Sequence, residues 1–473
     1  MTSTYSSAKY LMKLPLVCVS FLFLSGCFSS QLDQQDVFSV LAPEVLPERF
    51  GTGVMENPGQ ADTSVDAPIT RWLESFGSPE LNLLVKGAID NNHSLAQQAL
   101  LVKLAEQNVR ISKASLFPTL NLSLNAQRAD SGTVQASDYD LALVAGYELD
   151  LWGKLNANQK QSTLNLASQK ASYQLAERTL VRDVVNASVD TSTATQLLGL
   201  LSQRAQNLTE SLDVIQRGYR SGLNSALDVY LSRNTLEQER AGIANQQQLK
   251  FEAQTRLELL LGEYPAGAIS IAGGPMVLPT EPLSPGIPSE LLLRRPDIQQ
   301  AWLNLMAADA GVAIAHKNRF PSLNLSASLT DSDEDLGQLL SGGSLAWSLS
   351  ASLLQPLFQG GRLAALEMQA KIVLEQQERR YLELVYLAFS EVEVELNRKQ
   401  ALSDRYDAFV RAEQNATAAL ELGLDQYQRG LVDYTTVLEA QRRAFDAQTT
   451  LIELRNQQLK NRVNLLLALG GDY

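Results

Sequence analysis

The sequence predicts a mainly α-helical protein that is built twice from one structural half and carries a membrane-spanning β portion. Three observations predict this fold class. The motif Tyr-x-x-Gly-Leu at Tyr219 returns at Tyr427, about 208 residues later, and other motifs return in the same order. Each half also contains two segments of strict apolar-polar alternation and one very long segment without proline. A repeat of this length is a complete structural half and not a solenoid unit.

Residues 1–26 are predicted to be a lipoprotein signal peptide. Two lysines precede a short apolar stretch, and Leu24-Ser25-Gly26-Cys27 resembles the bacterial lipobox, in which the cysteine after the cleavage site takes a diacylglycerol. We therefore expect Cys27 to be the lipidated first residue of the mature chain, with an extended arm over residues 27–69. An ordinary signal peptide with an incidental cysteine is the alternative.

The composition excludes several classes of function. A net charge of -13 leaves no basic surface for nucleic acid. His93 and His316 lie in matching helical stretches without a convergent third ligand, and no spaced Cys/His cluster is present, so we expect no metal and no other cofactor. It has no phosphate-binding loop and no nucleophile motif, so we expect no catalytic residue and no enzyme activity. Beyond the N-terminus, no apolar run is long enough for a transmembrane helix.

The rest of the chain divides into two repeats joined by a connector. The first repeat, the connector and the second repeat are expected at residues 70–262, 263–296 and 297–473. Each repeat contains a helix, then a β-hairpin at 118–149 or 321–355, then a coiled-coil hairpin at 153–262 or 361–470. Thr70 is the expected N-cap of the first helix. Because the connector is rich in proline, we interpret it as a semi-rigid link outside the core.

The β-hairpins alternate as membrane-spanning strands do. Leu120, Leu122 and Leu124 lie on one face of the first strand, with small polar residues on the other, over the roughly 9 to 11 residues that cross a membrane. A soluble antiparallel sheet with one solvent-exposed face is the alternative. Four strands cannot enclose an aqueous channel, and lipid does not tolerate an open sheet edge. A spanning sheet therefore requires a ring of several copies.

The segments after each β-hairpin are typical of long coiled-coil helices. Residues 154–219 and 362–427 contain no proline, and each stretch would extend roughly 100 Å as a helix. A glycine follows each stretch, where a left-handed residue commonly ends a helix. We therefore place the tips of the two coiled-coil hairpins at Gly222 and Gly430.

The order of these segments resembles the outer-membrane efflux channel family, TolC-like, and its lipid-anchored OprM-like branch. The carrying motifs are the two Phe-Pro steps before the strands, the Tyr-x-x-Gly-Leu tips, Leu292–Ile298 and Leu438–Arg442. The resemblance implies a homotrimer, with a 12-stranded β-barrel in the bacterial outer membrane continued by a 12-helix α-barrel through the periplasm. It also implies three kinds of partner: outer-membrane lipid, a periplasmic adaptor (membrane fusion protein) and an inner-membrane pump.

The function implied by the resemblance is passive conduction of small amphiphilic compounds from the periplasm to the exterior, as the outer-membrane channel of a tripartite efflux system. Two alternatives stay open. The first is a type I protein-secretion duct, and the second is a lipid-anchored periplasmic coiled-coil scaffold that forms no channel. The lipobox and the Leu-Arg-Arg-Pro-Asp-Ile motif at Leu293 favour efflux of small molecules.

The resemblance also implies a gate at the periplasmic tip. Glu439 occupies the position of an acidic constriction, with Thr435 one helical turn before it. Three copies of Glu439 would repel one another and raise the pKa of the carboxylate; an ion pair with Arg442 or Arg443 is the alternative. The expected latch residues are Asp228, Tyr427 and Arg429, and the expected adaptor-contact tips are Gly222, Leu223, Gly430 and Leu431.

Overall fold

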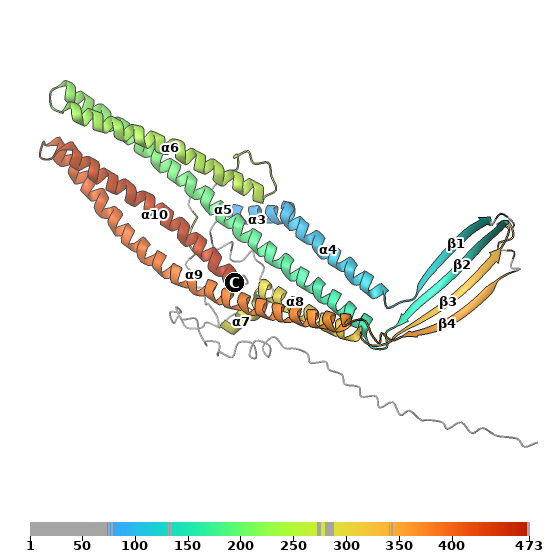
Figure 1. The fold of residues 1–473 in the computed structure, drawn as a ribbon. Helices are drawn as coiled ribbons and strands as arrows, with labels where there is room; N and C mark the ends of the chain where they lie inside the picture. Colours follow the sequence, from blue (N-terminus) through green and yellow to red (C-terminus); the bar gives the residue numbers. More distant parts are fainter. Residues whose placement is uncertain are drawn as a thin grey trace, which may run out of the picture.

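The structure is a computed structural model that describes residues 73, 76 and 79–470, apart from 131, 133–134, 272–275, 280–287, 340 and 342–343. A sheet lies at one end of an elongated molecule, and two helical hairpins extend to the other end (Figure 1). None of the helices within these described ranges has the length and apolar character needed to span a membrane. Cys27 and Thr70 fall outside the described residues, so lipidation and the first N-cap stay predictions.

Two consecutive helices, α3 (Pro79–Asn91) and α4 (His93–Ala114), precede the first strand. Asn92 separates them in an extended conformation. Its side-chain oxygen accepts a hydrogen bond from the Leu95 N–H at 2.9 Å and so caps α4, and its amide donates to the Leu260 carbonyl at 2.9 Å. The apolar spacing did not predict this break, because the residues on both sides of Asn92 remain helical.

Four strands form one antiparallel sheet in the order β1-β2-β3-β4. Their bounds are Thr119–Asp130, Gln135–Leu149, Ser322–Asp333 and Ala346–Leu354. The two halves of the chain meet where β2 pairs with β3, with Leu143 opposite Leu329. The strand β2 has 15 residues, more than the sequence predicted, because its polar start at Gln135 gives no apolar alternation.

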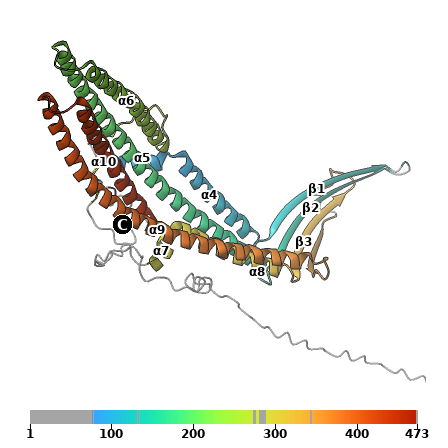
Figure 2. The same cartoon turned by 60° about the vertical axis from the view of Figure 1, so that its left-hand side comes forward.

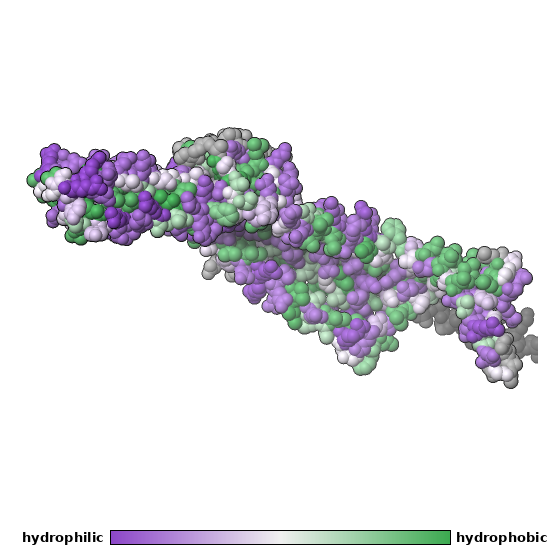
Figure 3. Space-filling view, turned by 90° about the horizontal axis from the view of Figure 1, so that it is seen from above, coloured by the Kyte–Doolittle hydropathy of each residue, from purple (hydrophilic) through white to green (hydrophobic). Residues whose placement is uncertain are grey.

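One face of the sheet is apolar across all four strands. The register aligns Leu122, Leu143, Leu329 and Trp347 in one row and Leu120, Ala145, Ala327 and Leu349 in the next. The row between them, on the other face, is polar except at Val144, with Asn121, Ser328 and Ser348 on the other three strands. Leu122 is 70% exposed and Trp347 is 78% exposed. Hydrophobic residues gather at this end of the molecule, whereas the hairpin tips are largely hydrophilic (Figure 3).

Each half contributes one coiled-coil hairpin, and the predicted duplication is confirmed. The helices are α5 (Lys154–Arg220) and α6 (Ala226–Leu260) in the first hairpin, and α9 (Arg362–Gln428) and α10 (Tyr434–Ala468) in the second. The long helices have 67 residues each and the return helices 35. Figures 1 and 2 show the two hairpins running together away from the sheet. At the tips, Gly222 and Gly430 have φ of 73° and 71°, a left-handed conformation that glycine adopts without strain.

The connector packs into the core, so the expectation that it stays outside was wrong. Met276 is buried in the cluster formed by α3, α5 and α6, and Leu292 packs against α8 (Pro296–Lys317) and α9. The short helix α7 (Pro288–Arg294) carries Leu292. Prolines restrict the backbone of this segment but do not prevent the apolar residues between them from being buried.

Candidate functional site: the paired hairpin tips

The tips of the two hairpins are joined by an apolar cluster at the end of the molecule far from the sheet. Ile215 of α5 packs with Tyr434 and Val437 of α10, and these side chains are only 4%, 4% and 1% exposed. Leu420, Leu424 and Tyr427 of α9 pack against the same cluster. The hairpins are therefore in contact at their tips within one protomer.

A capping box positions the Asp228 carboxylate at the start of α6. The Ser225 hydroxyl accepts from the Asp228 N–H at 3.1 Å, and Asp228 Oδ2 accepts from the Ser225 N–H at 3.2 Å. The same Oδ2 accepts a hydrogen bond from the Tyr427 hydroxyl at 3.1 Å. Two predicted latch residues from different halves of the chain are thus brought together, and their role as a latch remains a prediction.

Tyr427 is held in a position where it stays a hydrogen-bond donor. Burial, with the nearby Asp228 carboxylate, raises the pKa of Tyr427 well above its ordinary value. Its ring packs against the Tyr434 ring, with the centroids 5.2 Å apart and the planes at 50°. The phenol is therefore the donor, and the Asp228 carboxylate the acceptor, in the hydrogen bond between the two hairpins.

Arg429, the third predicted latch residue, has a partner on its own helix. Its guanidinium lies 2.8 Å from Asp425, and both side chains are exposed. An exposed ion pair between residues one turn apart contributes little to stability. Within one protomer, the structure therefore does not bring Arg429 together with Asp228 or Tyr427, and its latch role stays a prediction.

Glu439 and Thr435 both lie on the exposed side of α10. Arg442 and Arg443 each place a guanidinium nitrogen 2.9 Å from the Glu439 carboxylate. Hydrogen bonds from Arg442 and Arg443 lower the pKa of Glu439. Within one protomer, the pKa shift of Glu439 is therefore opposite to the one expected from three facing carboxylates. Repulsion between carboxylates requires the other two copies, whereas Arg442 and Arg443 lie on the same helix as Glu439.

The tip residues are open to solvent. Leu223 is 82% exposed and Leu431 is 69% exposed. A Cβ atom added at Gly222 or Gly430 would meet no atom within 4 Å, so the left-handed backbone alone requires glycine there. The tips consequently present two accessible leucines, each next to a glycine with a left-handed backbone.

Sequence reasoning missed two polar contacts that cross between the hairpins below the tips. Asp190 of α5 binds Lys460 of α10 at 2.7 Å and also accepts from Asn456 at 2.9 Å. Arg204 of α5 is 4% exposed and also reaches α10. The sequence signal for Arg204 was its position one helical turn before the apolar residue Leu208, on the same side of a predicted coiled-coil helix.

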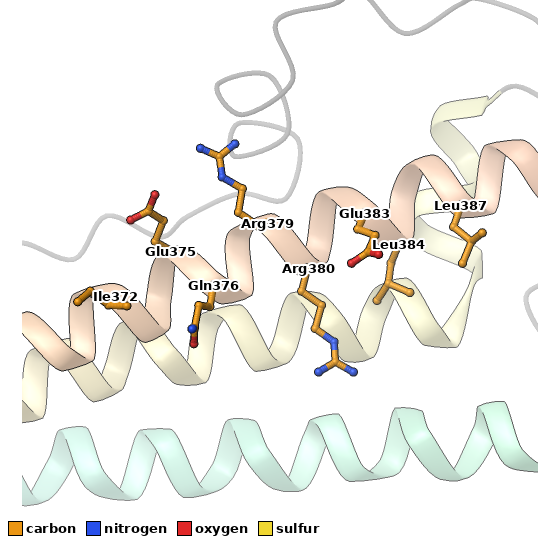
Figure 4. A pocket seen from close by; sticks show the side chains of 8 residues that line it. All are labelled: Ile372, Glu375, Gln376, Arg379, Arg380, Glu383, Leu384 and Leu387. Carbon is orange, nitrogen blue, oxygen red and sulfur yellow. The ribbon is translucent and has the colours of Figure 1, made fainter.

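The part of the chain that the structure describes offers no cluster suited to metal chemistry. Within these ranges, no group of His, Cys, Asp and Glu residues could hold a metal ion. A shallow groove of about 680 Å³ runs along α9 from Ile372 to Leu387 (Figure 4). Acidic, basic and apolar side chains share it, all from one helix, so the groove has no convergent polar group that defines a ligand.

The sequence model of the outer membrane efflux protein family matches residues 84–263 and 287–471. The two matched segments correspond to the two structural repeats and together span well over half of the chain. The chain belongs to this family. The predicted resemblance is therefore confirmed, and the protein is an outer-membrane efflux channel and not an enzyme.

Individual relatives agree over nearly the full length. The probable outer membrane lipoprotein SilC of Salmonella typhimurium is 29% identical over 469 residues, which cover 98% of this chain and 99% of the relative. The antibiotic efflux pump outer membrane protein ArpC of Pseudomonas putida is 31% identical over 448 residues, 91% of each chain. A crystal structure of a membrane protein from Pseudomonas aeruginosa aligns with a TM-score of 0.80 at 30% identity, covering 89% of this chain and 100% of that one.

Proposed function

We propose that three copies of this protein form a passive duct that carries small amphiphilic compounds out of the periplasm and opens at the hairpin tips. The observation that carries this proposal is the sheet, with an apolar face shared by all four strands and two unpaired edges at β1 and β4. An apolar face this exposed favours a lipid environment. In lipid, every backbone N–H and C=O needs a partner, so β1 of one copy pairs with β4 of the next.

Three copies supply twelve strands, and closure leaves no free edge. The polar face of the sheet then lines the interior, and the four helices of each copy continue the wall. The soluble-scaffold alternative places the apolar rows of the sheet in water and leaves both edges open. Exposed flat edges of that kind promote uncontrolled pairing with other chains, so the closed ring is favoured.

The gate that we propose lies at the tips. The hydrogen bond between Tyr427 and Asp228 joins the two hairpins of each protomer and opposes opening. Thr435 and Glu439 face the axis, where three carboxylates form a cation-attracting constriction. Arg442 and Arg443 moderate their repulsion in the closed state. Arg429 reinforces the latch once its Asp425 contact is released.

The partners in this proposal are a periplasmic adaptor and an inner-membrane pump. Leu223 and Leu431 are the accessible apolar side chains that an adaptor would cover, on the turns made by Gly222 and Gly430. Relatives are named for exporting cations (CusC), pyoverdine (OpmQ), antibiotics (ArpC) and toluene (TtgC). A duct of common design serves all of these, so the pump and adaptor select the compound, and small molecules are favoured over secreted proteins.

The proposal is tested by purifying the full chain in detergent and measuring its mass and its conductance in planar bilayers. We expect a trimer with discrete, low conductance, and restored drug tolerance when the gene is expressed with a matching pump and adaptor in a strain without its own channel. A protein that is monomeric and soluble without detergent would support the scaffold. Restored secretion of a protein substrate, without drug tolerance, would support the secretion duct.

A further inference from the structure

Arg204 is a buried cation that joins the two hairpins below the tip latch. It lies 16 residues before the end of α5, about 24 Å along the helix. Its Nη1 donates to Thr449 Oγ1 at 3.1 Å, and its Nη2 donates to the Phe445 carbonyl at 2.7 Å and to Gln448 Oε1 at 3.1 Å. The guanidinium carbon also lies 4.4 Å from the centre of the Phe445 ring. All of these acceptors belong to α10 and are neutral.

A carboxylate on the first hairpin interacts electrostatically with the same guanidinium, and one of its oxygens has no hydrogen-bond partner within the described part of the chain. Glu239 of α6 is half-buried, and burial raises its pKa while the charge of Arg204 opposes that shift. Among the described residues, Nε of Arg204 and Oε1 of Glu239 are both buried without a hydrogen-bond partner. Asp446 on α10 is a further charged group near Arg204. Arg204 is thus hydrogen-bonded to acceptors on α10, while the carboxylate of Glu239 on its own hairpin is an acceptor that it does not use.

We propose that Arg204 exchanges partners when the duct opens, leaving α10 and pairing with Glu239. Moving α10 away breaks all of these hydrogen bonds at once, and a guanidinium that loses its acceptors is strongly unfavourable until another acceptor reaches it. The Glu239 carboxylate on the same hairpin removes most of that penalty. The contact between the two hairpins then has two discrete arrangements, one with Arg204 bound to α10 and one with Arg204 bound to Glu239. The ion pair between Asp190 and Lys460 lies farther from the tip than Arg204. In this proposal it keeps α5 and α10 in contact at that level when the tips separate. This inference rests on the proposed function as a gated duct.

The test uses the full-length protein in planar bilayers, with Tyr427→Phe as the background so that opening is frequent enough to count. Glu239→Gln removes the charge of the idle partner and keeps its shape. We expect it to lower the open fraction about tenfold, which corresponds to about 1.4 kcal/mol for the whole trimer. Glu237→Gln is the matched control, because Glu237 is on the same helix but exposed and paired with Arg240.

Coupling between the two residues distinguishes partner exchange from a general effect on packing. With Arg204→Met there is no cation to transfer, so Glu239→Gln should change the open fraction less than twofold. Arg204→Lys keeps the charge but cannot span three acceptors; it should open more often and remain sensitive to Glu239→Gln. The proposal is overturned if Glu239→Gln has no effect, or if its effect is the same with and without the Arg204→Met substitution. A wild-type protein without any conductance would instead refute the proposed duct.

Discussion

Replacing Tyr427 by phenylalanine removes one hydroxyl from the contact between the two hairpins and leaves the ring packed against Tyr434. The lost hydrogen bond has a carboxylate acceptor, for which about 1.5–3 kcal/mol is typical. Tyr427 and Asp228 are both only half-buried, so screening by solvent reduces this to about 1 kcal/mol per protomer. If three latches open together, the closed state loses about 3 kcal/mol, which corresponds to roughly a 100-fold rise in the ratio of open to closed channels.

The assay is single-channel recording in planar bilayers, with uptake of a large antibiotic by whole cells as the second readout. We expect longer and more frequent openings in Tyr427→Phe and greater antibiotic susceptibility. Tyr230→Phe is the control, because Tyr230 lies on α6 near the tip but is 67% exposed. An open fraction unchanged by Tyr427→Phe, or raised equally by Tyr230→Phe, would show that the hydroxyl of Tyr427 does not hold the gate.

Three further predictions address other parts of the molecule. Glu439→Lys should reverse or abolish cation preference in bilayers, and unchanged selectivity would remove Glu439 from the constriction. Burial raises the pKa of Glu258, but hydrogen bonds from the N–H groups of Gly267, Ile269 and Ala268 lower this pKa by more, so the net shift is downward. The ionised Glu258 therefore contributes its full stabilisation of the fold above about pH 4.3, and this contribution is lost as the pH falls through the lower folded-state pKa. Thermal unfolding of Glu258→Gln should lack this acid-dependent component. Identical pH profiles for the variant and the wild type would contradict the stabilising role of the Glu258 carboxylate. Trp347→Arg on the apolar face should destabilise the membrane-inserted sheet by about 2–4 kcal/mol in denaturant titrations from lipid vesicles, whereas Ser348→Arg should not; equal effects would refute the lipid-facing assignment.

The general architecture could be predicted from the sequence because the signals are local and repeated. The alternation at Leu120, Leu122 and Leu124 depends only on the two-residue period of a strand, and the position of Gly222 depends only on the end of a helix. The duplication then doubles every such signal. The polar break at Asn92 and the polar start of β2 at Gln135 lack any periodic signal, so the sequence did not reveal them.

The site could be predicted only where a family motif marked it. Asp228 and Tyr427 lie near the two tip motifs, and their contact follows from the way the hairpins are packed. The contact of Arg204 with α10 joins residues 241 to 245 positions apart and has no motif at either end. The ion pairs of Glu439 with Arg442 and Arg443 were foreseeable, because the three residues are neighbours on one helix. The sequence did not show that, within a single protomer, these ion pairs would set the direction of the pKa shift of Glu439.

The shared wall between subunits is tested most directly by cross-linking its two edges. Cysteines placed together at Asn125 on β1 and Ser350 on β4 of the full-length protein are treated in membranes with a short bis-maleimide. Closure by three copies predicts a ladder that ends at the trimer, and no ladder when either cysteine is present alone. A ladder that continues past three copies, or a chain that stays monomeric, would contradict the closed trimeric ring.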